Sequence, residues 1–210
     1  MWGRWNLEEW SLTMTSAEWD PGPRPEAEEV QLLSLAKRGD IGAFRQIVIL
    51  HQRQVLRIAH RLLGRLELAE DAVQETFLRV FKHVHRYDER RKFSPWLYQI
   101  VINVCRDMNR KSQKELVLSL EDLQKKGGPL AVANPTDLEA NLDIARQRRL
   151  IKESLKVLSE KEREALVLRD LEGLSTRDVA RILGSSEGTV RSQISSARVK
   201  IKRFVEARMR

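Results

Sequence analysis

The chain has 210 residues, enough for one or two domains, and it is basic, with 38 Lys and Arg against 30 Asp and Glu. Its longest aliphatic run is Ile47–Leu50, far short of the roughly 20 apolar residues that cross a bilayer. No basic-then-apolar signal segment opens the chain, and the single cysteine, Cys105, excludes an internal disulfide framework. These features predict a cytoplasmic protein in a reducing compartment, with Cys105 as a packing residue.

Charge is distributed in four blocks along the chain. The net charge is −5 over residues 1–29, +8 over 30–111, −3 over 112–143 and +8 over 144–210. Two basic blocks separated by an acidic one predict two modules that meet a polyanion, joined by a tether that does not. The alternative is that Lys and Arg simply solvate helix faces.

The first half of the chain predicts a tail followed by a helical bundle. Residues 1–25 are expected to form a flexible tail, because proline and glycine follow four tryptophans; translation from Met1 or from Met14 stays open. Apolar residues then recur at three- and four-residue steps. The helices expected from this pattern cover residues 26–39, 40–64, 68–84 and 94–111, the last opened by Ser94 and Pro95. Together they predict a small four-helix bundle over residues 26–111.

The second half predicts a linker and a smaller helical domain. Residues 112–143 contain two glycines and two prolines with little periodicity, which indicates a flexible linker. Helical signal resumes near Ile144, and Ser159 with Glu162 forms a capping box. The helix after it is expected to end at Gly173 and to bury Ala165, Leu166, Leu168 and Leu171. The fold class is therefore all-α, with a second domain over residues 144–210.

Residues 174–203 carry the strongest local signal. Ser175 is expected to cap a helix to Leu183, with Asp178 as a capping-box partner, before a turn at Gly184 and a second cap at Ser186. Val190, Ile194, Ala197 and Ile201 are expected to face inward from the second helix. This pattern predicts a helix-turn-helix; the alternative is an ordinary helical hairpin with a solvated basic face.

A helix-turn-helix places the first turns of its second helix in the major groove of DNA. Short or polar side chains at these turns suit base edges and phosphates. The residues assigned to DNA are Ser175, Thr176, Gly188, Thr189, Arg191, Ser192, Ser195 and Arg198. Arg191 suits either a guanine edge or a phosphate, whereas Arg198 lies further along and is expected to contact phosphate only.

Three segments resemble the bacterial sigma-70 family of RNA polymerase subunits. Leu158 to Val205 reads LSEKEREALVLRDLEGLSTRDVARILGSSEGTVRSQISSARVKIKRFV and resembles the fourth region, which reads the minus-35 promoter element. Ala69 to Val84, AEDAVQETFLRVFKHV, resembles the polymerase-docking part of the second region. Phe93 to Lys111, FSPWLYQIVINVCRDMNRK, resembles the part that opens and reads the minus-10 element. Their order and the short linker resemble the extracytoplasmic-function class.

The helix over residues 68–84 carries an acidic and amide stripe. Asp71, Gln74, Glu75 and Leu78 fall on one face, away from the apolar face of Leu68, Ala72, Val73, Phe77 and Val80. Such a stripe suits a basic protein partner, which the resemblance implies to be core RNA polymerase. The alternative is a solvated face.

The loop near residues 87–96 mixes cations with aromatic rings. Arg90, Arg91 and Lys92 suit strand phosphates, and Phe93 and Trp96 suit stacking on unpaired bases, although both rings are alternatively core residues. The resemblance implies that this loop captures a base flipped from the minus-10 element. It also implies that Asn103 and Arg106 lie near the melted strand.

The resemblance implies a sigma factor that binds core polymerase and promoter DNA and is restrained by an anti-sigma factor, commonly a membrane-bound one. No cofactor, metal site, small-molecule substrate or enzyme activity is expected, because no phosphate-binding glycine loop, nucleophile motif or ligand cluster occurs in the sequence. The rival is a stand-alone helix-turn-helix regulator, which leaves the acidic stripe and the basic-aromatic loop unexplained. Gln193 and Ser196 stand where many relatives carry basic residues, so the upstream target sequence stays open.

Overall fold

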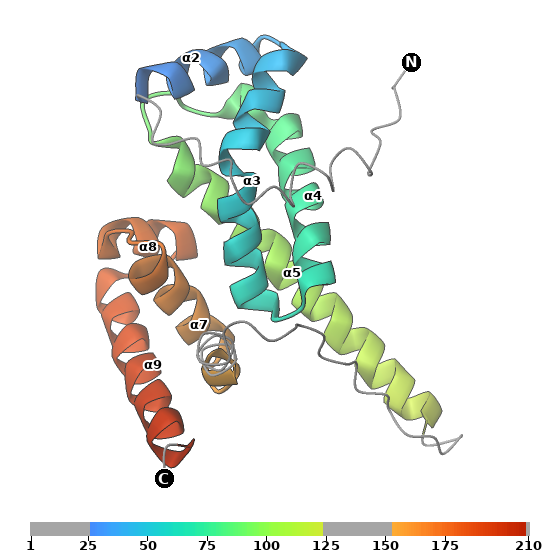
Figure 1. The fold of residues 1–210 in the computed structure, drawn as a ribbon, viewed down its shortest axis with the longest axis vertical. Coiled ribbons are helices and arrows are strands. Elements are labelled where there is room, and N and C mark those ends of the chain that lie inside the picture. The colour runs from blue at the N-terminus through green and yellow to red at the C-terminus, as the bar shows by residue number, and fades with distance from the viewer. Residues whose placement is uncertain (1–25, 124–152, 209–210) are drawn as a thin grey trace, which may run out of the picture. The chain divides into compact units, whose positions relative to one another are not determined.

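The computed structural model describes residues 26–123 and 153–208 (Figure 1). These residues form helices and short turns, and no strand occurs among them, which confirms the predicted all-α class. One compact unit of the chain ends at Leu50 and the second begins at His51. No helix within the described ranges is long and apolar enough to span a membrane.

The helices follow the predicted order. In the first half they are α2 (Glu26–Lys37), α3 (Ile41–Leu63), α4 (Leu66–His83), the 3₁₀ turn η1 (Val84–Arg86) and α5 (Phe93–Leu123). In the second half they are α7 (Glu160–Leu166), the π-helical turn η2 (Val167–Leu171), α8 (Thr176–Leu183) and α9 (Glu187–Arg208). The predicted tail over residues 1–25 and the predicted helix start near Ile144 lie outside the described residues.

Glycine and a capping carboxylate set the junction of α2 and α3. Gly39 has a φ of 92°, a backbone conformation that costs little only without a side chain. Asp40 then accepts a hydrogen bond at Oδ1 from the backbone N–H of Ala43, at 2.9 Å, and so caps α3. At the far end of α3, Gly64 again has a positive φ of 73°. These stops were predicted, and the structure confirms them.

Helices α4 and α5 pack against each other (Figure 1). Helix α5 begins at Phe93, so Ser94 and Pro95 lie inside its first turn, where proline is tolerated because the early N–H groups need no intrahelical partner. The helix also runs past Lys111, where its end was predicted, to Leu123. Residues 112–123 contain neither glycine nor proline, so nothing local ends the helix before Gly127.

Helix α7 begins at the predicted capping box. The Ser159 side chain accepts from the Glu162 N–H, and the Glu162 carboxylate accepts from the Ser159 N–H at 2.9 Å. The expectation that Leu171 is buried was wrong: its exposed fraction is 40%, whereas Ala165, Leu166 and Leu168 are buried. The π-helical turn η2 adds a residue to the turn and moves Leu171 off the buried face.

Helices α8 and α9 form the predicted helix-turn-helix. Ser175 caps α8 through its hydroxyl, Gly184 has a left-handed φ of 62°, and the Thr189 N–H donates to the Ser186 hydroxyl at 3.1 Å. Asp178 differs from the prediction, because its carboxylate accepts from the Ser175 hydroxyl, at 2.6 Å, and not from the backbone of the cap. The inward residues of α9 are Val190, Ile194 and Ala197, all buried, and Ile201, half-buried.

Candidate polymerase and DNA interfaces

The stripe predicted to dock on polymerase lies on the outer face of α4. Asp71, Gln74 and Leu78 are exposed, and Leu78 keeps 55% of its surface open, which is unusual for a leucine in a folded helix. Phe81, one turn beyond Leu78, is 37% exposed and extends the same face. The sequence analysis did not assign Phe81 to the stripe, although its spacing of three residues from Leu78 places both side chains on one face.

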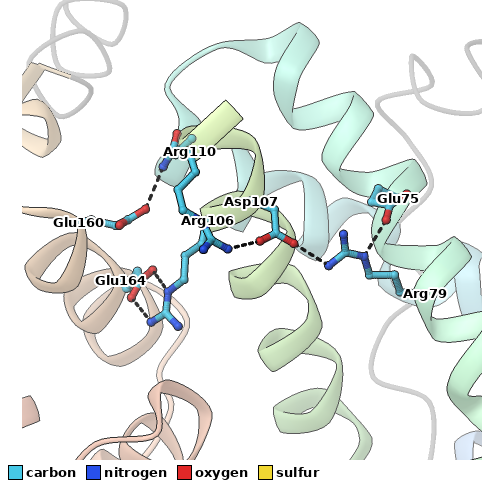
Figure 2. A network of polar contacts seen from close by, with 8 residues as sticks. Glu75, Arg79, Arg106, Asp107, Arg110, Glu160 and Glu164 are labelled. Atoms are coloured by element: carbon cyan, nitrogen blue, oxygen red, sulfur yellow. Dashed lines mark hydrogen bonds and ion pairs between the residues drawn. The ribbon is translucent and has the colours of Figure 1, made fainter. Parts of the chain in front are cut away.

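Glu75 differs from the rest of the stripe because it has an internal partner. Its carboxylate accepts from Arg79 Nε at 2.6 Å, and Arg79 NH1 donates to Asp107 of α5 at 3.0 Å (Figure 2). Arg110 completes the chain by donating to the other oxygen of Asp107. The hydrogen bond from Arg79 lowers the pKa of Asp107, so this chain of charges stays ionised and ties α4 to α5.

The predicted cationic loop is open to solvent. Arg90 and Arg91 keep 92% and 73% of their side-chain surface exposed, and both reach Asp88, at 3.2 and 3.6 Å. The backbone N–H of Arg90 also donates to Asp88 and is the main reason for the lowered pKa of that carboxyl. Exposed pairs of this kind hold side chains weakly, so both guanidinium groups are available to phosphate.

The aromatic rings beside this loop form a cluster. The Phe93 ring lies 5.1 Å from that of His51, 5.5 Å from that of Tyr87 and 5.6 Å from that of Trp96. Phe93 is 2% exposed, so of the two alternatives for this ring the structure supports the core residue. Trp96 is half-buried and keeps part of its ring accessible.

The polar face of α5 lines an open depression. Asn103 is exposed, but Arg106 donates from Nε and NH2 to both oxygens of Glu164 on α7, at 2.7 and 2.6 Å (Figure 2). A depression of about 580 Å³ lies beside this pair, lined by Arg79, Asn103, Arg106, Asp107, Arg110 and Glu160. The structure therefore brings the two α5 residues assigned to the melted strand to one surface, and it gives one of them a carboxylate partner.

The residues of α9 assigned to DNA are all exposed. They are Gly188, Thr189, Arg191, Ser192, Ser195 and Arg198. Arg191 pairs with Glu187 at 2.8 Å, and Arg198 donates to both oxygens of Asp170, at 2.9 and 2.8 Å. Of the two assigned residues before α9, Ser175 uses its hydroxyl in the α8 cap and Thr176 is half-buried.

Several polar residues with a clear structural role escaped the sequence analysis. Glu164 is 2% exposed as a residue, and Arg163 donates to the carbonyls of Leu62, Leu155 and Leu158, at 3.0, 2.9 and 3.2 Å. Burial lowers the pKa of Arg163 and raises that of Glu164. The sequence does show that the charged residue Glu164 falls on the inward side of a short helix. It does not show the partner, Arg106, which lies 58 positions away along the chain.

Two helical modules, the second ending in a capped helix-turn-helix with an exposed polar recognition helix, define a DNA-binding transcription protein. Residues 47–115 match the model of Sigma-70 region 2, and residues 148–201 match that of Sigma-70 region 4. The chain belongs to the extracytoplasmic-function group of the sigma-70 family. It is thus an RNA polymerase sigma factor, a subunit that directs promoter-specific transcription initiation.

Relatives and solved structures agree with this assignment. The chain is 31% identical over 173 residues to SigW of Bacillus subtilis, covering 80% of this chain and 91% of SigW. It is 33% identical over 184 residues to SigM of Mycobacterium tuberculosis, covering 88% of each. Among structures, CnrH in complex with the cytosolic domain of CnrY has a TM-score of 0.63 at 26% identity, covering 86% of this chain and 98% of that one. Bartonella quintana RpoE in complex with the anti-sigma factor NepR has 0.62 at 25%, covering 79% and 98%.

Proposed function

We propose that this sigma factor docks on core RNA polymerase through the exposed stripe of α4. Asp71, Gln74 and Leu78 supply an acidic, amide and apolar surface, to which Glu75 adds its carboxylate once it leaves Arg79. The single observation that carries this proposal is the 55% exposure of Leu78 within an otherwise polar face. On a face that stays in solvent, an exposed leucine gains nothing from burial of its apolar surface, whereas in a protein interface the partner buries it.

The downstream promoter element is assigned to the cationic loop and α5. Arg90, Arg91 and Lys92 follow the phosphates of the opened strand, and Trp96 stacks on an unpaired base. Phe93, buried in the aromatic cluster, supports the loop from beneath. Asn103 and Arg106 extend the strand-binding surface along α5.

The upstream element is assigned to the start of α9. Gly188 permits a close approach of the backbone, Thr189 and Ser192 suit phosphates or base edges, and Arg191 is the residue best suited to a guanine. Ser195 and Arg198 continue along the same exposed side. Ser175 and Thr176, at the start of α8, suit contacts with the DNA backbone.

The domain boundaries and the partners follow from these assignments. Residues 26–111 form the polymerase-docking and minus-10 module, and residues 144–210 form the minus-35 module. Residues 112–143 join them, with α5 reaching into that segment. The chain acts in the cytoplasm without enzymatic activity of its own. Because CnrH and RpoE were solved with CnrY and the anti-sigma factor NepR, an anti-sigma factor, membrane-bound or soluble, is the expected regulator.

Run-off transcription with purified core polymerase tests the proposed function. A promoter-dependent product is expected only when the full chain is added to core enzyme. A stand-alone helix-turn-helix regulator would give no such product, and neither would a chain that binds DNA but not polymerase. Fragments of genomic DNA from the source bacterium serve as template, because the promoter sequence is not readable from the chain.

A further inference from the structure

The cationic loop between η1 and α5 has no apolar residue of its own. Residues 88–92 read DERRK, so none of their side chains is suited to a core. The segment also lacks glycine and proline, the residues that most strongly favour a particular turn. Hydrogen bonds and the residues at its two ends therefore decide the conformation of this loop.

Asp88 gives the loop its local shape. The backbone N–H of Arg91 donates to the Asp88 carbonyl at 3.0 Å, which closes a turn. The backbone N–H of Arg90 donates to Asp88 Oδ1 at 3.1 Å. Both bonds join residues within the turn, so they shape it but do not attach it to the helical bundle.

Tyr87 attaches this turn to the bundle. Its backbone N–H donates to the Val84 carbonyl at 3.0 Å, and the residue is only 4% exposed. Its side-chain hydroxyl donates to the backbone carbonyl of Arg91. A buried phenol needs a hydrogen-bond partner, and here the partner lies at the far end of the turn. Tyr87 thus ties the end of the turn back to its beginning.

The aromatic cluster fixes the ring that carries this hydroxyl. The Tyr87 ring meets Phe93 edge-on, with an interplanar angle of 87° at 5.5 Å, and lies 5.2 Å from the Trp96 ring. Edge-to-face packing is a favoured arrangement of aromatic pairs. The Phe93 ring also packs against His51 of α3. Because neighbouring rings surround the Tyr87 ring, its hydroxyl is held at one place.

The result is a fixed backbone that carries free cations. Arg90 and Arg91 keep 92% and 73% of their side-chain surface exposed, although the Arg91 carbonyl is tied to Tyr87. Trp96, which contacts the Tyr87 ring, is half-buried. Binding a single strand by phosphate contacts and base stacking needs both groups at a suitable spacing. A spacing that is set before binding lowers the entropy lost when the strand is bound.

We propose that Tyr87 is a positioning residue for capture of the opened promoter strand. Through the Arg91 carbonyl, its hydroxyl sets the place of the cationic turn relative to Trp96, so that phosphate contacts and stacking occur together. This proposal rests on the proposed role of Arg90, Arg91 and Trp96 at the minus-10 element. Tyr87 acts through these residues, because its own side chain is buried.

Removing the hydroxyl alone tests the proposal. Tyr87→Phe keeps the ring, and we expect holoenzyme carrying it to open a promoter about fivefold more slowly, the scale of one hydrogen bond. The template is a promoter fragment found in the run-off assay, and permanganate oxidation of unpaired thymines follows opening. The affinity of the closed complex is expected to stay unchanged, because its bases are still paired.

Tyr98→Phe is the matched control. It removes the same atom from the other tyrosine of the chain, which lies on α5 and is 2% exposed. Holoenzyme with Tyr98→Phe is expected to open the promoter at the wild-type rate. Urea midpoints of both variants, measured by circular dichroism, show how much stability each has lost, and a general loss of stability would affect closed-complex formation as well as opening.

A double-mutant cycle distinguishes positioning from a merely structural role. Replacing Arg90 and Arg91 by alanine removes both guanidinium groups but keeps the carbonyl to which Tyr87 donates. If Tyr87 acts through these cations, adding Tyr87→Phe in that background should slow opening by much less than fivefold. An equal slowing in both backgrounds overturns the proposal.

Hydrogen exchange tests the geometry without DNA or polymerase. In the free full-length chain, Tyr87→Phe is expected to speed amide exchange of the peptide covering residues 88–92 at short labelling times, because the turn loses its attachment. Tyr98→Phe is expected to exchange there as the wild type does. Unchanged exchange in Tyr87→Phe overturns the proposal, since the hydroxyl would then not fix the loop.

The outcomes separate this proposal from the proposed function. A wild-type chain that is active in run-off transcription, with Tyr87→Phe opening the promoter as fast as Tyr98→Phe, overturns the positioning role alone. A wild-type chain that gives no run-off product contradicts the proposed function, and the role of Tyr87 in strand capture fails with it.

Discussion

Glu162 and Glu164 lie two residues apart on α7 and face different parts of the molecule. Glu162 accepts hydrogen bonds from Ser196 and Lys200 of α9, at 2.6 and 2.8 Å, and from the Ser159 N–H at 2.9 Å. Glu164 accepts from Arg106 of α5 alone among the described side chains. The hydrogen bond from Lys200, followed by that from Ser196, lowers the pKa of Glu162 to about 2, whereas burial raises the pKa of Glu164.

The difference separates contacts made within region 4 from a contact made with region 2. The donors of Glu162 all belong to region 4, so the charged carboxylate is stabilised whenever that region is folded. Glu164 depends on one arginine from region 2, and without it burial opposes the charged form. Helix α7 thus uses Glu162 to stabilise region 4 itself, and it uses Glu164 to contact Arg106 of region 2.

Removing Arg106 is expected to have the largest effect on stability. Arg106→Ala leaves the Glu164 carboxylate buried without its partner, which costs about 3 kcal/mol unless the helices separate and water reaches the charge. We expect a lower urea midpoint, measured by circular dichroism. Arg110→Ala is the matched control, because Arg110 lies on the same helix with 71% of its side chain exposed.

A double substitution shows whether the loss comes from the stranded charge. Arg106→Met with Glu164→Leu replaces both members by apolar side chains of similar volume, and such replacements are often neutral. The urea midpoint is expected to return toward the wild-type value. A double variant as unstable as Arg106→Ala would mean that packing, and not the carboxylate, accounts for the loss.

Glu162 is expected to contribute less, and in a defined pH window. Because its pKa is lowered from 4.5 to about 2 on folding, its stabilisation is complete above about pH 4.5 and is lost as the pH falls toward 2. Glu162→Gln is expected to be less stable than the wild type by about 1 to 2 kcal/mol at neutral pH, and equally stable near pH 2. Urea midpoints of both proteins across this range measure the difference, and a constant difference would contradict the assignment.

Local signals predicted the frame of both modules. Ser159, Ser175 and Ser186 were read as helix caps, and Gly39 and Gly184 as helix stops, because each acts through the backbone within a few residues. The structure bears out all five. Local hydrogen bonding and backbone conformation are the properties that a single sequence reports best.

The structure differs from the sequence-based predictions where contacts between distant residues, or a change in helical phase, determine which side chains are buried or paired. Leu171 fits a helical apolar pattern, and the π-helical turn that exposes it leaves no mark in that pattern. Phe93 in a basic loop suits base stacking, and only the nearby rings of Tyr87 and His51 place it in the core. The pair of Arg106 with Glu164 joins residues 58 positions apart, which periodicity does not report.

Asp71 extends the comparison to a carboxylate on the outside of the protein. Asp71 is exposed on α4, so Asp71→Lys is expected to change stability by less than about 0.5 kcal/mol. Affinity for core polymerase, measured by fluorescence anisotropy of the labelled chain, is expected to fall about tenfold through like-charge repulsion with a basic partner. Glu206→Lys reverses a charge outside α4 and should bind normally. Equal affinities of the two variants would remove Asp71 from the docking face.

The arginines of α9 are expected to have the smallest effect on stability. The Arg198 pair with Asp170 resembles the Arg106 pair in its distances, but 64% of the Arg198 side chain is exposed, so Arg198→Ala should leave the urea midpoint unchanged. The effect of Arg198→Ala should appear in DNA binding, where losing a phosphate contact weakens binding equally for all sequences and lowers the slope of log affinity against log salt by about 1.

Arg191→Ala should instead cost about 1–3 kcal/mol of binding free energy at one base pair, if Arg191 reads a base. Titrating holoenzyme against a randomised upstream element at two salt concentrations distinguishes the two roles, and an Arg191→Ala variant that alters neither preference nor salt slope would exclude α9 from the groove.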